Sequence, residues 1–200
     1  MQYSKPVQRR AIDTERRFLD AMRLVLKTTS FKNTSVALIA EKAGLTKTAF
    51  LKRFKSKENA LFALFGEYCD EASKTIREIL TDLHSFESVD EVLLSMSTRL
   101  EEIQLAHFSV NRAMHEIYME NLQTHPLTVQ IFKETVAMMV DVQQKFFADH
   151  SCSKMGAYSA AQLLVTINYN YVLKAMPALP SEGNLRHKLI TDILSSALKR

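Results

Sequence analysis

Hydroxyl and basic side chains gather in residues 31–58, which read FKNTSVALIAEKAGLTKTAFLKRFKSKE. An apolar-periodic run after Thr34 and Ser35 predicts a short helix that stops at Gly44, where a tight turn needs a residue that tolerates positive φ. Thr46 then caps a second short helix, whose aromatic residues are buried on one side. Its free side presents Lys47, Thr48, Leu51, Lys52 and Arg53. This pattern is typical of a helix-turn-helix whose second helix enters the major groove of double-stranded DNA.

Charge is distributed unevenly along the chain. Residues 1–60 hold 14 Lys and Arg against 5 Asp and Glu, whereas residues 61–200 hold 12 against 17, for a net charge of +4. Lys47 and Lys57 each begin a predicted helix, where the helix dipole disfavours a cation by about 0.3–1 kcal/mol unless a phosphate lies nearby. Either lysine alone could simply be solvated, but the pair favours phosphate binding. The basic head predicts a DNA-binding end on an acidic body.

Composition predicts an all-α protein. The chain has 200 residues, 46% of them hydrophobic, and only 4 Gly and 4 Pro, too few for a sheet protein rich in tight turns. The N-terminus lacks the apolar core of a signal peptide, and no stretch is long and apolar enough to span a membrane, so we expect a cytoplasmic protein. Cys69 and Cys152 show no metal spacing and are expected to be thiols.

Helical periodicity predicts about nine helices. Residues 1–11 are expected to form a flexible basic arm, and a helix over residues 14–28 would pack beneath the helix-turn-helix and complete a three-helix head. Ser56 would cap a long helix that leads into the body. The body would contain helices near residues 88–104, 108–121, 127–149, 156–176 and 184–198.

Residues 12–72 resemble the TetR family of bacterial transcriptional regulators. The spaced set that carries the resemblance is Phe18-Leu19-x-Ala21, Thr34-Ser35, Ile39-Ala40-x-x-Ala43-Gly44-Leu45-Thr46 and Phe54-x-Ser56-Lys57-Glu58-x-x-Leu61. The resemblance implies a DNA-binding domain over residues 12–72, with the helix-turn-helix at about 35–54, and an effector-binding and dimerisation domain over residues 73–200. It also implies a homodimer through the last two helices (about 156–176 and 184–198), and a small-molecule effector that releases a repressor from a palindromic operator.

The same resemblance assigns roles within the DNA-binding segment. It places Lys47, Thr48, Leu51 and Lys52 on the recognition helix, and it places Thr34, Ser35, Arg53 and Lys57 near the phosphates. With Thr46, which begins the recognition helix, these are the nine candidate DNA-binding residues. The family usually carries a small residue or Gly at position 48 and Tyr at position 51, whereas this chain has Thr48 and Leu51. Without the Tyr hydroxyl, Lys52 and Arg53 would carry more of the backbone binding, and Leu51 could contact a thymine methyl group.

Methionine and aromatic residues in the body predict a pocket that accepts apolar ligands of loosely defined shape, because methionine side chains are flexible. The candidate ligand-binding residues are Met96, His107, Phe108, Met114, His115, Tyr118, Met138 and Tyr169. For each of these residues, packing in an ordinary core is the alternative. The acidic body favours an apolar or cationic effector over an anionic one. His107 and His115 are too widely spaced to chelate one metal, so no metal and no cofactor is assigned.

No enzyme motif stands out in the sequence. The chain lacks a Gly-rich phosphate loop, a nucleophile elbow and a reliable pair of catalytic carboxylates. Asp90-Glu91 and Glu101-Glu102 are expected on solvated helix faces. The alternative to a ligand-responsive repressor is therefore a DNA-bound protein that has no small-molecule effector and recruits or blocks a protein partner.

Overall fold

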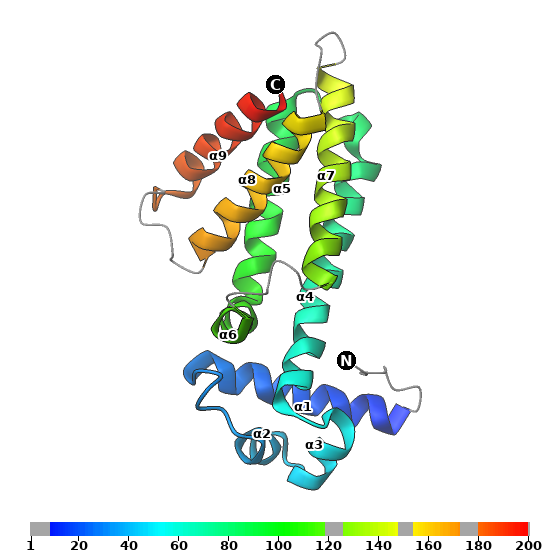
Figure 1. Ribbon diagram of the computed structural model, residues 1–200, viewed down its shortest axis with the longest axis vertical. Coiled ribbons are helices and arrows are strands. Elements are labelled where there is room, and N and C mark those ends of the chain that lie inside the picture. The colour runs from blue at the N-terminus through cyan, green and yellow to red at the C-terminus, as the bar shows by residue number, and fades with distance from the viewer. Residues whose placement is uncertain (1–8, 119–125, 148–153, 173–179, 200) are drawn as a thin grey trace. The chain divides into compact units, whose positions relative to one another are not determined.

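The computed structural model describes residues 9–118, 126–147, 154–172 and 180–199. This part of the chain folds into nine α-helices and one 3₁₀ turn and contains no strand (Figure 1), which confirms the all-α prediction. The elements are α1 (Arg9–Thr28), α2 (Val36–Ala43), α3 (Lys47–Phe54), α4 (Lys57–Thr81), η1 (Leu83–Ser85), α5 (Val89–Ala106), α6 (Phe108–Tyr118), α7 (Pro126–Phe146), α8 (Lys154–Val172) and α9 (Gly183–Leu198).

The predicted N-terminal arm is wrong for residues 9–11, which belong to α1. Thr14, expected at the start of the first helix, lies inside it, and its hydroxyl donates to the Arg10 carbonyl at 2.8 Å. Arg and Ala favour helix strongly enough to extend α1 by more than a turn, although Ile12 in that extension is exposed. Residues 1–8 and the predicted helical residues 173–176 lie outside the described residues.

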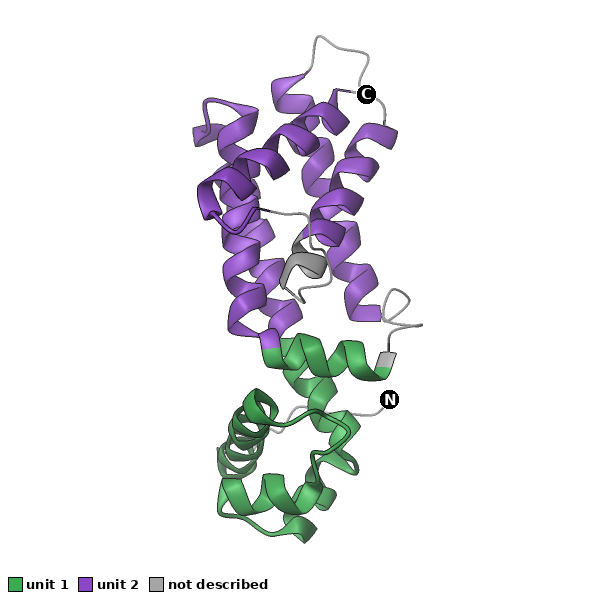
Figure 2. Ribbon diagram, turned by 90° about the vertical axis from the view of Figure 1, so that its left-hand side faces the viewer, with its two compact units in different colours: residues 1–67, 109–122 green, residues 68–108, 123–200 purple. Residues whose placement is uncertain are grey.

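The chain divides into two compact units (Figure 2), the first comprising residues 1–67 and 109–122 and the second residues 68–108 and 123–200. Unit 1 therefore contains α6 as well as the three N-terminal helices, whereas the predicted domain boundary at residue 72 assigned α6 to the body. Two hydrogen bonds explain the association of α6 with the head. Arg112 donates to the Leu26 carbonyl at 2.7 Å, and the Phe31 amide donates to Glu116 at 2.9 Å.

The core of unit 1 is aromatic. Phe18 of α1 meets Phe50 and Phe54 of α3 edge to face, with ring centroids 5.2 and 6.2 Å apart. All three rings are almost completely buried. Aromatic pairs in this geometry contribute roughly 0.5–1.5 kcal/mol beyond their buried area, so these contacts hold the short α3 helix against α1.

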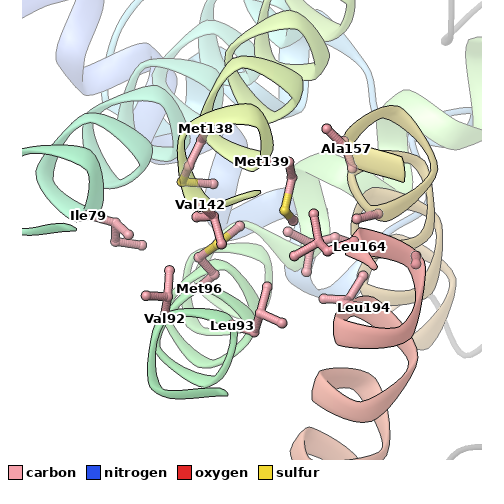
Figure 3. Packing of buried hydrophobic residues seen from close by; sticks show 14 of the residues in the cluster. Ile79, Val92, Leu93, Met96, Met138, Met139, Val142, Ala157, Leu164 and Leu194 are labelled. Carbon is pink, nitrogen blue, oxygen red and sulfur yellow. The ribbon is translucent and has the colours of Figure 1, made fainter. Parts of the chain in front are cut away.

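Unit 2 has a core of aliphatic and methionine side chains from α4, α5, α7, α8 and α9 (Figure 3). Met96 of α5 and Met138 of α7 point into this cluster together with Val142 and Leu164. In the described part of the chain, no helix combines the length and the hydrophobicity that crossing a membrane requires.

A buried ion pair in unit 2 corrects one prediction. Glu101, expected on a solvated face, is buried between α5 and α9, where Arg186 Nη2 donates to it at 2.6 Å and His187 Nε2 lies 2.7 Å away. The sequence prediction failed because the partners are 85 and 86 residues away in the chain. Its neighbour Glu102 is exposed, as are Asp90 and Glu91, as predicted.

Candidate nucleic-acid interface

The turn between α2 and α3 has the geometry that the sequence predicted. Ser35 caps α2 by accepting the Leu38 amide at 3.1 Å. Gly44 ends α2 with φ 62° and ψ 35°, a left-handed conformation that glycine adopts without a steric penalty. Arg17 of α1 fixes the turn from outside, because its Nη2 donates to the Ala43 carbonyl at 2.8 Å and to the Gly44 carbonyl at 3.2 Å.

One side of helix α3 is buried and the other is exposed. Thr46 caps it by accepting the Ala49 amide at 3.1 Å, as predicted. Phe50 and Phe54 anchor its inner side in the aromatic core. The exposed side chains at and after its start are Thr46, Lys47, Thr48, Leu51 and Lys52. Five of the nine predicted DNA-binding residues thus share one accessible stretch of a capped helix.

Arg53 differs from this group. Its side chain is only 19% exposed and pairs with Glu15 of α1, itself 11% exposed. The guanidinium also lies 5.9 Å from the Phe54 ring. Arg53 was expected on the free face of α3, but in the structure it pairs with Glu15 within unit 1 and so links α3 to α1. Its predicted contact with phosphate stays a prediction.

Thr34 and Lys57 hold the loop between α1 and α2. Thr34 is buried, and its hydroxyl donates to the Ser30 carbonyl at 2.9 Å. Lys57 Nζ donates to the carbonyls of Phe31 and Thr34, both at 2.9 Å, and lies 4.4 Å from the Phe31 ring. These two predicted DNA-binding residues therefore have structural contacts of their own, which the sequence did not indicate.

A surface hollow of about 470 Å³ lies beside α3 in unit 1. It is lined by Thr34, Ser35, Val36, Ala37, Lys47, Ser56, Lys57 and Glu58. These residues belong to the beginnings of α2, α3 and α4, where unsatisfied backbone N–H groups and the helix dipole favour an anion. Ser35 is exposed, and its hydroxyl hydrogen remains able to donate. The hollow is therefore chemically suited to a phosphate.

The predicted ligand-binding residues are divided between the two units. Met96 and Met138 are fully buried in the core of unit 2, and Met114 is fully buried in unit 1. His107 of unit 2 pairs with Glu71 at 2.9 Å. Phe108 belongs to unit 2 and His115 to unit 1. Tyr118 and Tyr169 lie on α6 and α8, but their side chains fall outside the described residues.

Two open hollows of about 410 Å³ each are found in unit 2. One lies on α4 and is lined by Lys74, Arg77, Glu78, Thr81 and Asp82. The other, between α8 and α9, is lined by Ser159, Leu163, Asp192, Ile193, Ser196 and Ala197. Neither includes a predicted ligand-binding residue. Among the described residues, no group of three His, Cys, Asp or Glu side chains could hold a metal ion.

The sequence reasoning missed two supporting residues of the interface, Glu15 and Arg17. Glu15 contacts Arg53 across 38 positions, and Arg17 contacts Ala43 across 26 positions. The helical spacing of α1 indicates which residues face its core, but it does not indicate which polar side chains at the edge of that face reach α2 and α3.

The fold and this geometry define a helix-turn-helix protein with a helical body. Residues 18–64 match the family model described as "Bacterial regulatory proteins, tetR family". The match to the tetR family thus covers the helix-turn-helix, and the chain as a whole has the fold of solved TetR-family regulators. Comparison with curated proteins yields no match.

Solved structures of transcriptional regulators, two of them described as TetR family, share the fold over nearly the whole chain. A regulator from Marinobacter aquaeolei VT8 is 18% identical with a TM-score of 0.66, covering 97% of this chain and 100% of that one. PfmR from Thermus thermophilus is 13% identical with a TM-score of 0.64, covering 92% and 94%. The ketosteroid transcriptional regulator KstR2 of Mycobacterium tuberculosis is 17% identical with a TM-score of 0.61, covering 98% and 97%.

Proposed function

We propose that the protein is a transcriptional regulator that binds duplex DNA with α3 in the major groove. The observation that carries this proposal is one set of exposed side chains on a helix that its cap and the buried Phe50 and Phe54 hold in place: Thr46, Lys47, Thr48, Leu51 and Lys52. Thr48 and Leu51 would contact base edges, while Lys47 and Lys52 would contact phosphates. The hollow at the beginnings of α2, α3 and α4 would receive a further phosphate.

Fluorescence anisotropy with duplexes from the DNA flanking the protein's own gene tests this proposal. Leu51→Ala should lower the affinity for the preferred duplex by about 1 kcal/mol, because Leu51 would lose its apolar contact with a thymine methyl group. Leu24→Ala provides the matched control, because Leu24 is an exposed leucine on α1. Equal affinities of wild type and Leu51→Ala for every duplex would argue against base contact by α3.

The protein would act as a homodimer through α8 and α9. Both helices expose large apolar side chains, namely Met155 and Tyr158 on α8 and Leu185 and Leu189 on α9. The hollow between α8 and α9 adds a concave surface that a second copy could fill. A two-fold dimer would place two α3 helices on successive major-groove faces about 34–36 Å apart, matching a palindromic site. A monomer in sedimentation velocity at micromolar concentration would contradict this arrangement.

The regulator would act as a repressor that a small effector releases from DNA. The effector would favour a state with low DNA affinity. The coupling free energy between effector binding and DNA binding would be about 1–3 kcal/mol. The methionine-rich core of unit 2 and the acidic body support an apolar or cationic compound. Thermal-shift screening should find that such compounds stabilise the protein, and a screen in which only carboxylates and phosphates do so would contradict this choice.

The second candidate is a DNA-bound protein without a small-molecule effector, which recruits or blocks a protein partner. It is favoured by the complete burial of Met96 and Met138 in packed core, and by the absence of predicted ligand-binding residues from the two open hollows described in unit 2. A compound that stabilises the protein and also releases DNA would decide for the repressor. Stabilisation without any release of DNA would favour the second candidate.

A further inference from the structure

The residue that follows α3 has an unusual backbone conformation. Lys55 has φ 69° and ψ −39°, and it is the one non-glycine residue with positive φ in the described part of the chain. This region of φ and ψ brings Cβ into conflict with the backbone, so a lysine there is strained where glycine would not be. The amide of Lys55 donates to the Leu51 carbonyl at 3.0 Å, which ends α3 at this point.

The side chain of Lys55 is also free to meet a partner. Lys55 is exposed, and the structure gives its ammonium no ion pair or hydrogen bond with any residue it describes. The next two residues, Ser56 and Lys57, line the hollow at the beginnings of α2, α3 and α4. Along the chain, Lys55 therefore comes between the exposed residues of α3 and two residues that line the surface suited to a phosphate.

We propose that Lys55 binds a phosphate of the DNA backbone, and that its strained conformation directs the ammonium toward that phosphate. Reversing the sign of φ changes the direction in which Cβ leaves the chain, so the conformation sets where the side chain points. The favourable dipole at the C-terminus of α3 also attracts a cation, but a lysine kept for that reason alone would stabilise the fold on balance. If the strain outweighs the dipole, the wild-type protein is instead less stable to unfolding than Lys55→Gly. This inference rests on the proposed DNA binding.

The test compares Lys55→Gly, which removes both charge and strain, with Lys55→Gln, which removes the charge alone. Lys27→Gln is the matched control, because Lys27 is an exposed lysine in the last turn of α1. Loss of one phosphate contact should reduce the slope of log affinity against log salt by about 0.9, equivalent to a roughly fivefold loss at 0.15 M salt. Both Lys55 variants should show this loss, and Lys27→Gln should not.

Thermal unfolding supplies the second readout. Lys55→Gly should melt about 1–4 °C above Lys55→Gln, because only the glycine variant relieves the strain. A Lys55→Gly protein that melts below Lys55→Gln would overturn the role of the strain. An unchanged salt slope in both Lys55 variants, or an equal loss in Lys27→Gln, would overturn the phosphate contact while DNA binding by wild type stood. Wild-type protein that binds no duplex at any salt concentration would overturn both the proposed function and this inference.

Discussion

Replacing Lys57 by Met should weaken the fold of unit 1 as well as DNA binding. The substitution keeps the aliphatic stem but removes the ammonium that donates to the carbonyls of Phe31 and Thr34, both at 2.9 Å. Hydrogen bonds from a charged group contribute about 1.5–3 kcal/mol each when buried, and partial exposure of Lys57 reduces that value. The lost cation–π contact with the Phe31 ring adds about 0.5 kcal/mol. We therefore expect a loss of about 2–3 kcal/mol in the free energy of unfolding.

Urea unfolding and salt-dependent DNA binding separate the two roles of Lys57. The free energy of unfolding reports the bonds to the loop, whereas a decrease of about 0.9 in the salt slope would report a phosphate contact. Lys52→Met is the control, because Lys52 is exposed on α3 and should leave stability within about 0.5 kcal/mol of wild type. A Lys57→Met protein as stable as wild type would refute the reasoning that Lys57 holds the loop.

Three further predictions concern stability and reactivity. Gly44→Ala should lower the free energy of unfolding by about 1–2 kcal/mol, because φ is 62° at this position, and an unchanged urea midpoint would contradict that. Glu101→Ala should cost about 3–5 kcal/mol by removing the carboxylate that neutralises buried Arg186, whereas the exposed neighbour variant Glu102→Ala should cost under about 0.5 kcal/mol; similar losses would contradict burial of the pair. Burial raises the pKa of Cys69 to about 12 from 9.0, so iodoacetamide at pH 8 should spare native Cys69 in a Cys152→Ser background, and rapid labelling would contradict this.

The raised pKa of Cys69 also fixes the sign of a pH effect. The thiol stays protonated in the folded state at pH values where it ionises in the unfolded state. The folded state then binds more protons, so the contribution of Cys69 to stability is complete below pH 9.0 and is lost as the pH rises toward 12.

Local signals in the sequence were sufficient for the helix-turn-helix and the starts of its helices, although they placed the start of α1 too late. The hydroxyls of Thr46 and Ser56 cap α3 and α4 as predicted, with Ser56 accepting the Asn59 amide at 3.2 Å. Ser35, which precedes the predicted first helix of the motif, caps α2. Gly44 has the predicted positive φ. These features depend on residues three or four positions apart, so a single sequence contains the information that determines them.

Long-range contacts were not predictable in this way. Glu101 was placed on a solvated face together with Glu102, yet it is buried, and Arg186 on α9 compensates its burial. Arg53 was placed on the free face of α3, but Glu15 of α1 binds it. In each case, the partner lies on another helix that is distant in the sequence. The helical period describes the faces of one helix and does not indicate which residues of another helix pack against it.

Selection of binding sites from random-sequence duplexes tests the central claim, that α3 reads base edges in the major groove, most directly. Wild-type protein should enrich a palindromic motif whose half-sites are centred about 10–10.5 base pairs, or a multiple of that, apart. Thr48→Ala and Leu51→Ala should each change the preferred bases at symmetric positions in both half-sites. The absence of any enriched motif, or a motif identical for wild type and both variants, would contradict the claim.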